Sequence, residues 1–399
     1  MPLLVVYNPV CGHGTARTFF QETVIPLLQE HGHHPDKIQE TTHEGHAGDV
    51  VVEFLKSAAG PVSIVLGSGD GTLHEIICAL HAAPSPESRR KITFALIPCG
   101  TANALYSSFF PSSASNQAPP TKLESLHSLL GLNSPSAPRP ITLAITTFPS
   151  SSTAVDAKRS SISAVVTSTA LHASILHDSE ALRATHPGIE RFKIAAQQNI
   201  TRWYHATVRL LPAGDSIQVY DRSTDTFVPY PQVASEVAGP ADIHGPFAYF
   251  LSTVNVDRLE PLFRIAPLQT SLPPPLPPAT LDIVIVRPSR DKLVKAESTS
   301  DRELFAGKCM TVLGAAYRDG AHVKMAYDSS GEIVEDEGAE SGSVVEYYRC
   351  GGWEWIPEEA DDHAHLVCAD GEVLRVDPKS KATCVATQNL DGYSISVYI

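Results

Sequence analysis

A single carboxylate, Asp70, lies among three glycines in the stretch GSGDGT, residues 67–72. The apolar pattern predicts a buried strand over residues 62–66 and a helix over residues 73–80. Glycine lets the backbone approach a ligand closely, and the N–H groups at the start of a helix favour an anion such as phosphate. The stretch therefore combines the features of a phosphate-binding turn with one group that can accept a proton.

Two further loops have the same character. NPVCGHGTA, residues 8–16, follows the apolar run 3–7, and PCGTANA, residues 98–104, follows the apolar run 92–97. In open α/β sheets, ligands bind where the carboxyl ends of the strands meet the helix N-termini. Three such loops within about a hundred residues predict one phosphate-binding site at the edge of a sheet, although neither G-x-G-x-x-G nor G-x-x-x-x-G-K-[ST] is present.

The elements that must position these loops alternate between strand and helix up to about residue 110. This alternation predicts an α/β domain, a parallel sheet with helices on both faces. The composition then changes to the linker-like stretches 111–120 and 133–140. We therefore expect an α/β domain over 1–140 and a β-rich domain over 141–399, mostly an antiparallel β-sandwich. Its strand candidates are 141–148, 163–169, 204–212, 247–256, 281–288, 344–350 and 393–399.

Charge and cysteine usage narrow the class of protein. The net charge of −14, from 30 basic and 44 acidic residues, argues against nucleic acid as a partner. The odd number of cysteines, seven, and the absence of a C-x-x-C pair indicate neither a disulfide framework nor a zinc site. No leader or membrane-spanning pattern is present, so a cytoplasmic location is expected, with transient contact with a membrane surface left open. The oligomeric state and any metal ligands stay unknown.

Read together, the three loops resemble the catalytic domain shared by diacylglycerol kinases and sphingosine kinases: N-P-x-x-G-x-G-x-A, S-G-D-G-x-x-H-E and P-x-G-T-x-N-A. Thr41, the segment HDSEALRATHPGIERF (177–192) and ADGE (369–372) are similar to the sphingosine kinase branch. The resemblance covers nearly the whole chain and implies an NAD-kinase/diacylglycerol-kinase-like fold. It also implies that ATP and Mg²⁺ are used to transfer the γ-phosphate to the primary hydroxyl of a lipid.

The resemblance also implies residue roles. Asp70 would be the catalytic base that takes the proton of the lipid hydroxyl. Some residues have a plainer interpretation: Thr72 and Glu75 have the spacing of a helix capping box, Asp370 fits a hairpin turn, and Arg183 with Arg191 fits a solvated helix face. The implied nucleotide-binding residues are Asn8, Gly12, Gly14, Thr15, Thr41, Gly69, Gly71, Glu75, Gly100, Thr101, Asn103, Glu180, Arg183, Arg191, Asp370 and Glu372.

The sequence departs from the family at two places. Cys11 stands where the family usually has Gly or Ser, and His13 and Thr15 stand where it often has lysine. The second departure is in the acceptor segment, residues 173–180, which matches the part of sphingosine kinases expected to hold the ammonium group of the acceptor lipid. Here Ser174 and Leu176 replace two aspartates of sphingosine kinases. Leucine cannot pair with the ammonium group of a sphingoid base. Asp178 could replace it if the segment is a strand, because residues two apart then share a face.

The favoured prediction is an ATP-dependent lipid kinase similar to sphingosine kinases, with a sphingoid base as the acceptor. One alternative is a lipid kinase whose acceptor has no free amine, such as diacylglycerol or ceramide. A second is a kinase of a soluble metabolite related to NAD kinases, which share a G-G-D-G-T loop. A third is a non-catalytic relative that only binds lipid or nucleotide.

Overall fold

The computed structural model describes residues 1–111, 121–133, 137–149, 159–186, 188, 190–230, 240–335 and 342–399. Most of the predicted linker 111–120 lies outside these residues. The described chain divides into two compact units. The first contains Met1–Leu143, Leu259–Pro261 and Thr387–Ile399, and the second contains Ala144–Arg258 and Leu262–Ala386.

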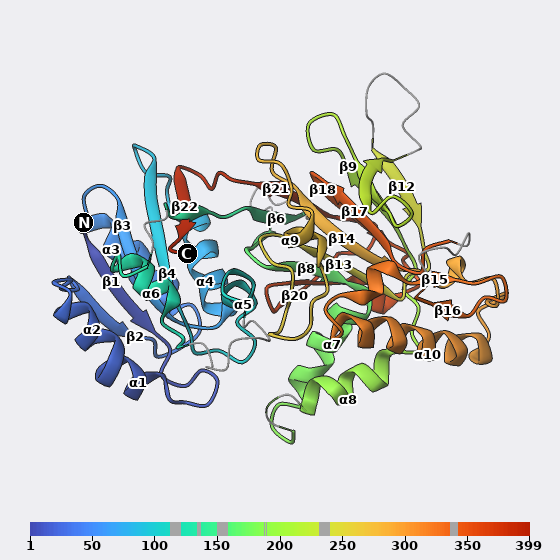
Figure 1. Ribbon diagram of the computed structural model, residues 1–399, viewed down its shortest axis with the longest axis horizontal. Helices are drawn as coiled ribbons and strands as arrows, with labels where there is room; N and C mark the ends of the chain where they lie inside the picture. The colour runs from blue at the N-terminus through green and yellow to red at the C-terminus, as the bar shows by residue number, and fades with distance from the viewer. Residues whose placement is uncertain are drawn as a thin grey trace. The chain divides into compact units, whose positions relative to one another are not determined.

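The first unit is built on one sheet with the strand order β2–β1–β3–β4–β22–β5 (Figure 1). All neighbouring pairs are parallel except β22 with β5. The register pairs Tyr7 with both Glu40 and Gly67, and it pairs Ser68 with Pro98. Four strands therefore end at one edge of the sheet. The strands are β1 (Leu3–Tyr7), β2 (Lys37–Glu40), β3 (Val62–Ser68), β4 (Arg90–Pro98), β5 (Arg139–Pro140) and β22 (Tyr393–Val397).

Helices cover both faces of this sheet, as the sequence predicts. Alternate side chains of β1 and β3, with Val5 and Val65 among them, pack on one face against Phe20 and Leu28 and against Leu126 of α6. Helices α3 and α4 pack against each other and contact β1 and β3. The helices are α1 (Ala16–Phe19), α2 (Ile25–Glu30), α3 (His46–Ser57), α4 (Asp70–Ala82), α5 (Ala104–Phe109) and α6 (Glu124–Leu129).

The C-terminal strand corrects the expected domain division. The sequence analysis assigns residues 393–399 to the β-rich half, whereas Tyr393–Val397 forms β22 and pairs in parallel with β4. A parallel neighbour needs a long connection, and here almost the entire second unit provides it. Nothing local in the sequence marks such a return, because the apolar pattern of a strand does not identify its partner.

The second unit consists, in its described part, mainly of antiparallel sheets. The longer one has the order β11–β10–β17–β14–β13–β8–β19–β20, and the other has β12–β9–β18–β21–β6–β7. Their strands are β6 (Leu143–Phe148), β7 (Arg159–Ser163), β8 (Val166–Thr169), β9 (Ala206–Leu211), β10 (Gln218–Asp221), β11 (Thr226–Pro229), β12 (Ala241–His244), β13 (Tyr249–Thr253), β14 (Leu281–Val286), β17 (Glu346–Cys350), β18 (Gly352–Pro357), β19 (Leu366–Ala369), β20 (Glu372–Arg375) and β21 (Ala382–Thr387). The short strands β15 (Ala326–Tyr327) and β16 (Ile333–Val334) pair separately.

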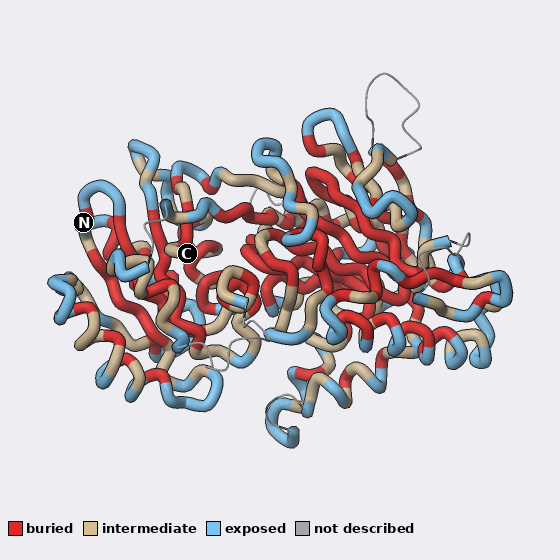
Figure 2. Tube along the Cα trace, viewed as in Figure 1, coloured by how far each residue is buried: buried red, intermediate tan, exposed pale blue. Residues whose placement is uncertain are grey.

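Aromatic side chains join the two larger sheets of the second unit. Trp353 and Trp355 on β18 are fully buried and contact Phe250 on β13 with ring centroids 5.3 Å apart. The indole of Trp353 also donates a hydrogen bond to the Ser252 hydroxyl at 3.0 Å. The strands of this unit are therefore largely buried, as the red segments in Figure 2 show.

Helices α7 (Ala170–Ala181), α8 (Glu190–Asn199), α9 (Leu268–Ser271) and α10 (Thr299–Ala316) complete the second unit. Helix α7 contacts α8 and the strands β8, β13 and β19. Among the described residues, none of the helices combines the length and the apolar character that crossing a bilayer requires.

Candidate active site

The three glycine-bearing loops lie against one another at the carboxyl edge of the first sheet. Gly12 adopts a φ of +55°, and a Cβ built on it would lie 2.3 Å from the carbonyl oxygen of Cys99. A Cβ on Gly100 would lie 2.4 Å from the Cα of Gly69. Both distances are far below any contact that a real Cβ makes, so only glycine permits this approach. The structure therefore brings the first, second and third loops together, as the sequence predicts.

Asp70 is the first residue of α4, and the start of α5 holds its carboxylate. One oxygen accepts a hydrogen bond from the amide of Ala104 at 2.7 Å, and the other accepts one from the amide of Leu105 at 3.2 Å. Burial raises the pKa of the Asp70 carboxyl above its ordinary value, and the two amide donors only partly oppose that effect. Asp70 is thus held in a fixed orientation and is a stronger proton acceptor than an exposed aspartate.

Asn103 shapes the third loop. Its φ of 52° places it in the left-handed region, directly before α5. Its side chain accepts a hydrogen bond from the Gly100 amide at 2.9 Å and donates one to the Gly100 carbonyl at 2.8 Å. Asn103 therefore orders the loop that presents the amides of Ala104 and Leu105 to Asp70.

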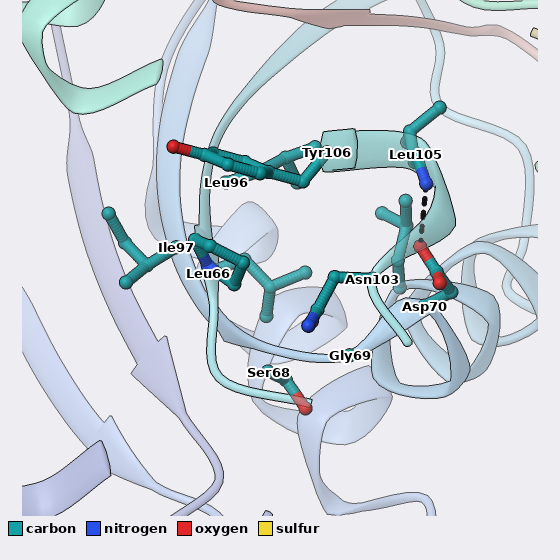
Figure 3. Close-up of a pocket in the computed structure, with 11 residues that line it drawn as sticks. Leu66, Ser68, Gly69, Asp70, Leu96, Ile97, Asn103, Leu105 and Tyr106 are labelled. Carbon is teal, nitrogen blue, oxygen red and sulfur yellow. Dashed lines mark hydrogen bonds between the residues drawn. The ribbon is translucent and has the colours of Figure 1, made fainter. Parts of the chain in front are cut away.

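A small pocket of about 20 Å³ lies beside Asp70 (Figure 3). This is close to the space that one water molecule needs. Its wall is mostly apolar, and its polar side chains are those of Ser68, Asp70 and Asn103. The remaining lining residues are Leu66, Gly69, Leu73, Leu96, Ile97, Pro98, Leu105 and Tyr106. A carboxylate next to an apolar wall is partly desolvated, which agrees with the raised pKa of Asp70.

The predicted capping box is wrong. Helix α4 begins at Asp70, two residues before Thr72, so Thr72 lies inside the first turn. Its hydroxyl instead shares a 2.5 Å hydrogen bond with the hydroxyl of Ser68. Glu75 accepts a hydrogen bond from the amide of Gly45 at 3.0 Å, at the start of α3, and burial raises its pKa. Glu75 therefore links two helices.

The first loop is largely exposed and leads into α1. The Asn8 amide donates a hydrogen bond to the carbonyl of Gly67 at 2.9 Å, which ties this loop to the end of β3. Gly12, Gly14 and Thr15 face solvent, and Thr15 precedes α1 without a side-chain cap. The N–H groups at this helix start are therefore accessible to a ligand.

The other residues predicted in the first unit also lie near this edge. Thr41 directly follows β2 and is buried, and its amide donates a hydrogen bond to the Tyr7 carbonyl at 2.9 Å. Gly71 and Thr101 are exposed in the second and third loops. The structure thus gathers all the predicted first-unit residues at the strand ends, or, for Glu75, in the second turn of α4.

Three predicted residues of the second unit form a charged cluster. Glu180 lies on the last turn of α7, and Arg183, just beyond that helix, forms an ion pair with its carboxylate at 2.6 Å. Arg191 on α8 lies 3.7 Å from the same carboxylate. Burial lowers the pKa of the Arg191 guanidinium, and the nearby charge of Arg183 adds to this effect. The guanidinium of Arg191 also lies over the Phe192 ring at 4.6 Å. The cluster therefore has features of both interpretations. Glu180 and Arg183 are exposed, as on a solvated helix face, whereas Arg191 is mostly buried, as in an anion-binding site.

Asp370 and Glu372 occupy the turn between β19 and β20, where the hairpin interpretation placed Asp370. The Asp370 carboxylate accepts hydrogen bonds from the amides of Ala164, Val165 and Val166 at 2.6, 3.1 and 2.7 Å. Glu372 accepts one from the Ser161 hydroxyl at 2.7 Å. The Asp370 carboxylate therefore fixes the turn between β7 and β8, a structural role that the sequence did not indicate.

The acceptor segment is a helix, and this corrects one expectation. Ser174, Leu176 and Asp178 all lie on α7, so Asp178 does not share the face of Leu176, as it would on a strand. Leu176 packs into an apolar cluster with Ala173 and Leu366.

Asp178 instead lies one helical turn beyond Ser174, whose side chain is fully buried. Asp178 accepts a hydrogen bond from the Asn199 side chain at 2.8 Å, and another links it to His177 at 2.8 Å. It therefore cannot replace an aspartate at position 176, although it offers a carboxylate on the face of α7 that carries Ser174.

Several contributors to the site were not predicted. Leu105 and Tyr106 line the pocket, and the amides of Ala104 and Leu105 orient Asp70. Backbone donors carry no side-chain signature, so only the predicted alternation of strand and helix, which continues to about residue 110, could have indicated a helix start after the third loop. Within the described residues, no group of three His, Cys, Asp or Glu side chains is placed to hold a metal ion.

Comparison with known proteins agrees with this geometry. Residues 2–129 match the diacylglycerol kinase catalytic domain family. Human sphingosine kinase 2 is 36% identical over 103 residues, which is 26% of this chain and 15% of that protein. Sphingosine kinase 1 of Arabidopsis thaliana is 35% identical over 106 residues, 27% of this chain and 21% of that protein. Mitochondrial acylglycerol kinase of Xenopus laevis is 31% identical over 107 residues, 27% of this chain and 24% of that protein.

The chain therefore matches about a quarter or less of the length of these three relatives. Among solved structures, a candidate diacylglycerol kinase from Bacillus anthracis str. Sterne superimposes with a TM-score of 0.50 at 15% identity. That match covers 99% of this chain and 97% of the other, so it supports the fold. Residues 2–129 therefore match the diacylglycerol kinase catalytic domain family, and the chain is similar over about a quarter of its length to sphingosine kinases and an acylglycerol kinase.

Proposed function

We propose that this protein transfers the γ-phosphate of ATP to the primary hydroxyl of a lipid. The observation that carries the proposal is the convergence of three glycine-bearing loops beside Asp70, at the ends of parallel strands. Phosphoryl transfer depends on positioning and on neutralising charge rather than on covalent chemistry. Exposed loop amides at helix starts meet that need for the phosphates.

The nucleotide would lie over the three loops. Gly12, Gly69 and Gly100 let the three loops pack this closely, and the starts of α1 and α4 would supply N–H groups. Magnesium usually binds through substrate phosphates, water and one or two carboxylates, so the lack of a three-residue cluster among the described residues fits an ion that arrives with ATP. Such an ion would neutralise phosphate charge.

Asp70 would act as the general base. The lipid oxygen bonds to the γ-phosphorus, the bond from that phosphorus to the β–γ bridging oxygen breaks, ADP leaves, and the hydroxyl proton passes to Asp70. Each carboxylate oxygen has a further lone pair beyond the one that accepts the amide of Ala104 or Leu105. The amides therefore orient the base and still leave it able to accept a proton.

The surroundings of Leu176 favour an acceptor without an ammonium group. The side chain packs against Ala173 and Leu366, and an ammonium placed there would lose its water without gaining a counterion. We therefore propose a neutral lipid of the acylglycerol or ceramide type as the acceptor. The second candidate is the sphingoid base favoured by the sequence resemblance, and the observation for it is Asp178, whose carboxylate lies on the face of α7 that carries Ser174.

A labelled-ATP assay on a lipid panel tests the proposal. Diacylglycerol, monoacylglycerol, ceramide, sphingosine and NAD are offered in mixed micelles to the wild type and to Asp178→Asn. We expect label in a neutral lipid, at equal rates in both proteins. Label in sphingosine that Asp178→Asn selectively reduces would support the second candidate. Label in NAD alone would indicate a soluble-metabolite kinase, and no label with any acceptor would contradict the proposal.

A further inference from the structure

Cys11 and Cys99 bring two thiols together within the loops that would hold the nucleotide. Cys11 lies in the first loop and Cys99 directly follows β4 in the third loop, 88 positions apart in the sequence. The neighbouring Gly12 approaches so closely that a Cβ on it would lie 2.3 Å from the Cys99 carbonyl oxygen. The backbone of the first loop is therefore packed directly on Cys99.

The two side chains interact directly. The interaction with Cys99 lowers the pKa of Cys11, and the nearby Ser68 hydroxyl adds to that effect. The Cys11 sulfur also lies 3.0 Å from the carbonyl oxygen of Asn8. Two thiols on loops packed this closely need only a small movement to bond, since a disulfide requires the two side chains to approach closely and to point toward each other.

The environment separates Cys11 from the other cysteines, whereas the interaction with Cys11 and burial raise the pKa of Cys99. Both thiols are half-buried, and Cys11 lies between Val10 and Gly12, which are exposed. The interaction with Cys99 lowers the pKa of Cys11. In contrast, burial raises the pKa of the remaining fully buried thiols to about 12, and those thiols are Cys309, Cys350, Cys368 and Cys384. Thiolate character and access to solvent decide which cysteine reacts with an oxidant.

We propose that Cys11 and Cys99 form a reversible disulfide on exposure to a peroxide, and that this bond closes the nucleotide site. The Cys11 thiolate attacks one oxygen of the peroxide, the O–O bond breaks, and Cys11 becomes a sulfenic acid while hydroxide leaves. The Cys99 sulfur then bonds to the Cys11 sulfur and displaces the sulfenic oxygen as water. In total, two thiols and one hydrogen peroxide give one disulfide and two waters. A dithiol reductant reverses the bond.

The bond would act on the site because it links two of the loops that converge there. It would join the loop that precedes α1 to the loop that precedes α5, and so remove the freedom of both to adjust around the phosphates. The loss of ATP binding rests on the proposed function, whereas formation of the disulfide does not.

The test is a titration of the full chain with hydrogen peroxide, read by non-reducing peptide mapping. We expect one cross-linked peptide pair containing Cys11 and Cys99 at the lowest doses, and recovery of free thiols with dithiothreitol. Cys78→Ser is the matched control, since Cys78 is also half-buried but lies in α4. Oxidation of Cys78 at the same dose, or oxidation of Cys11 beyond the sulfenic acid without a cross-link, would overturn the proposal.

Calorimetric titration with ATP then measures whether the disulfide changes the binding of ATP. We expect loss of binding in the oxidised wild type and in oxidised Cys78→Ser, recovery of binding on reduction, and no effect of peroxide on Cys11→Ser. A cross-link that left ATP affinity unchanged would overturn the closing effect. Failure of the reduced wild type to bind ATP would contradict the proposed function instead, while the peptide map would still report the disulfide.

Discussion

Gly100→Ala tests the convergence of the loops. A Cβ at this position would lie 2.4 Å from the Cα of Gly69 and 2.8 Å from its amide nitrogen. These are backbone atoms at the end of β3, so they cannot rotate away as a flexible side chain could. The methyl group must therefore push the second and third loops apart.

The magnitude follows from the cost of forcing extra volume into a packed region, about 1–3 kcal/mol. For a unit of this size, each kcal/mol moves the melting temperature by about 2–4 °C. The displacement should also disturb Asn103, whose oxygen would lie 3.0 Å from the new Cβ. We expect both lower thermal stability and weaker binding of ATP.

Gly71→Ala is the matched control. Gly71 is one residue beyond Asp70 in α4, and a Cβ there meets nothing within 4 Å. Because alanine favours a helix over glycine by up to about 1 kcal/mol, this variant should be as stable as the wild type or more stable. Differential scanning calorimetry on both variants makes the comparison. A Gly100→Ala melting temperature equal to that of the wild type would refute the close approach of the loops.

Three further predictions concern single side chains. Leu176→Asp should lower the free energy of unfolding by several kcal/mol, because it places a carboxylate in an apolar cluster. Leu176→Met should lower the same free energy by about 1 kcal/mol or less. Urea denaturation compares the two variants, and equal midpoints would disprove the packing. Asp370→Ala should lower the free energy of unfolding by about 2 kcal/mol or more, because three amides lose their acceptor. Asp377→Ala, a substitution at an exposed position, should change it little. Because its pKa is raised, the Asp70 carboxyl holds its proton more tightly in the folded protein than in the unfolded chain. The contribution of this protonated carboxyl to stability is therefore complete below the pKa of the unfolded state, and it is lost as the pH rises through the pKa of the folded state. Stability curves of the wild type and Asp70→Asn should therefore diverge with pH over that window, and parallel curves would contradict the shift.

The sequence predicted the first unit well because its signals are local. Each loop follows an apolar run and precedes a helical pattern, and parallel strands place such loops at one edge without further information. The close approach of Gly12 to Cys99 and of Gly69 to Gly100 agrees with that reasoning. The glycines were therefore sufficient to predict that the three loops converge.

Elsewhere the decisive contacts are distant in sequence. Tyr393–Val397 carries a strand pattern, but its parallel partner β4 lies about 300 positions earlier. Glu75 has the spacing of a cap, yet its partner is the Gly45 amide on another helix. Residues 170–181 alternate too weakly between apolar and polar to distinguish a helix from a strand, so the face of Asp178 was assigned wrongly. Patterns over a few residues cannot supply these pairings.

Transfer of the γ-phosphate by Asp70→Asn, compared with the wild type at equal ATP occupancy, tests the central claim most directly. The substitution keeps one oxygen that can accept an amide hydrogen bond but removes the group that takes the proton. We predict that calorimetry shows ATP binding in both proteins and that transfer to the lipid falls by at least about 10²-fold in the variant. Transfer by Asp70→Asn at the wild-type rate would contradict the assignment of Asp70 as the base.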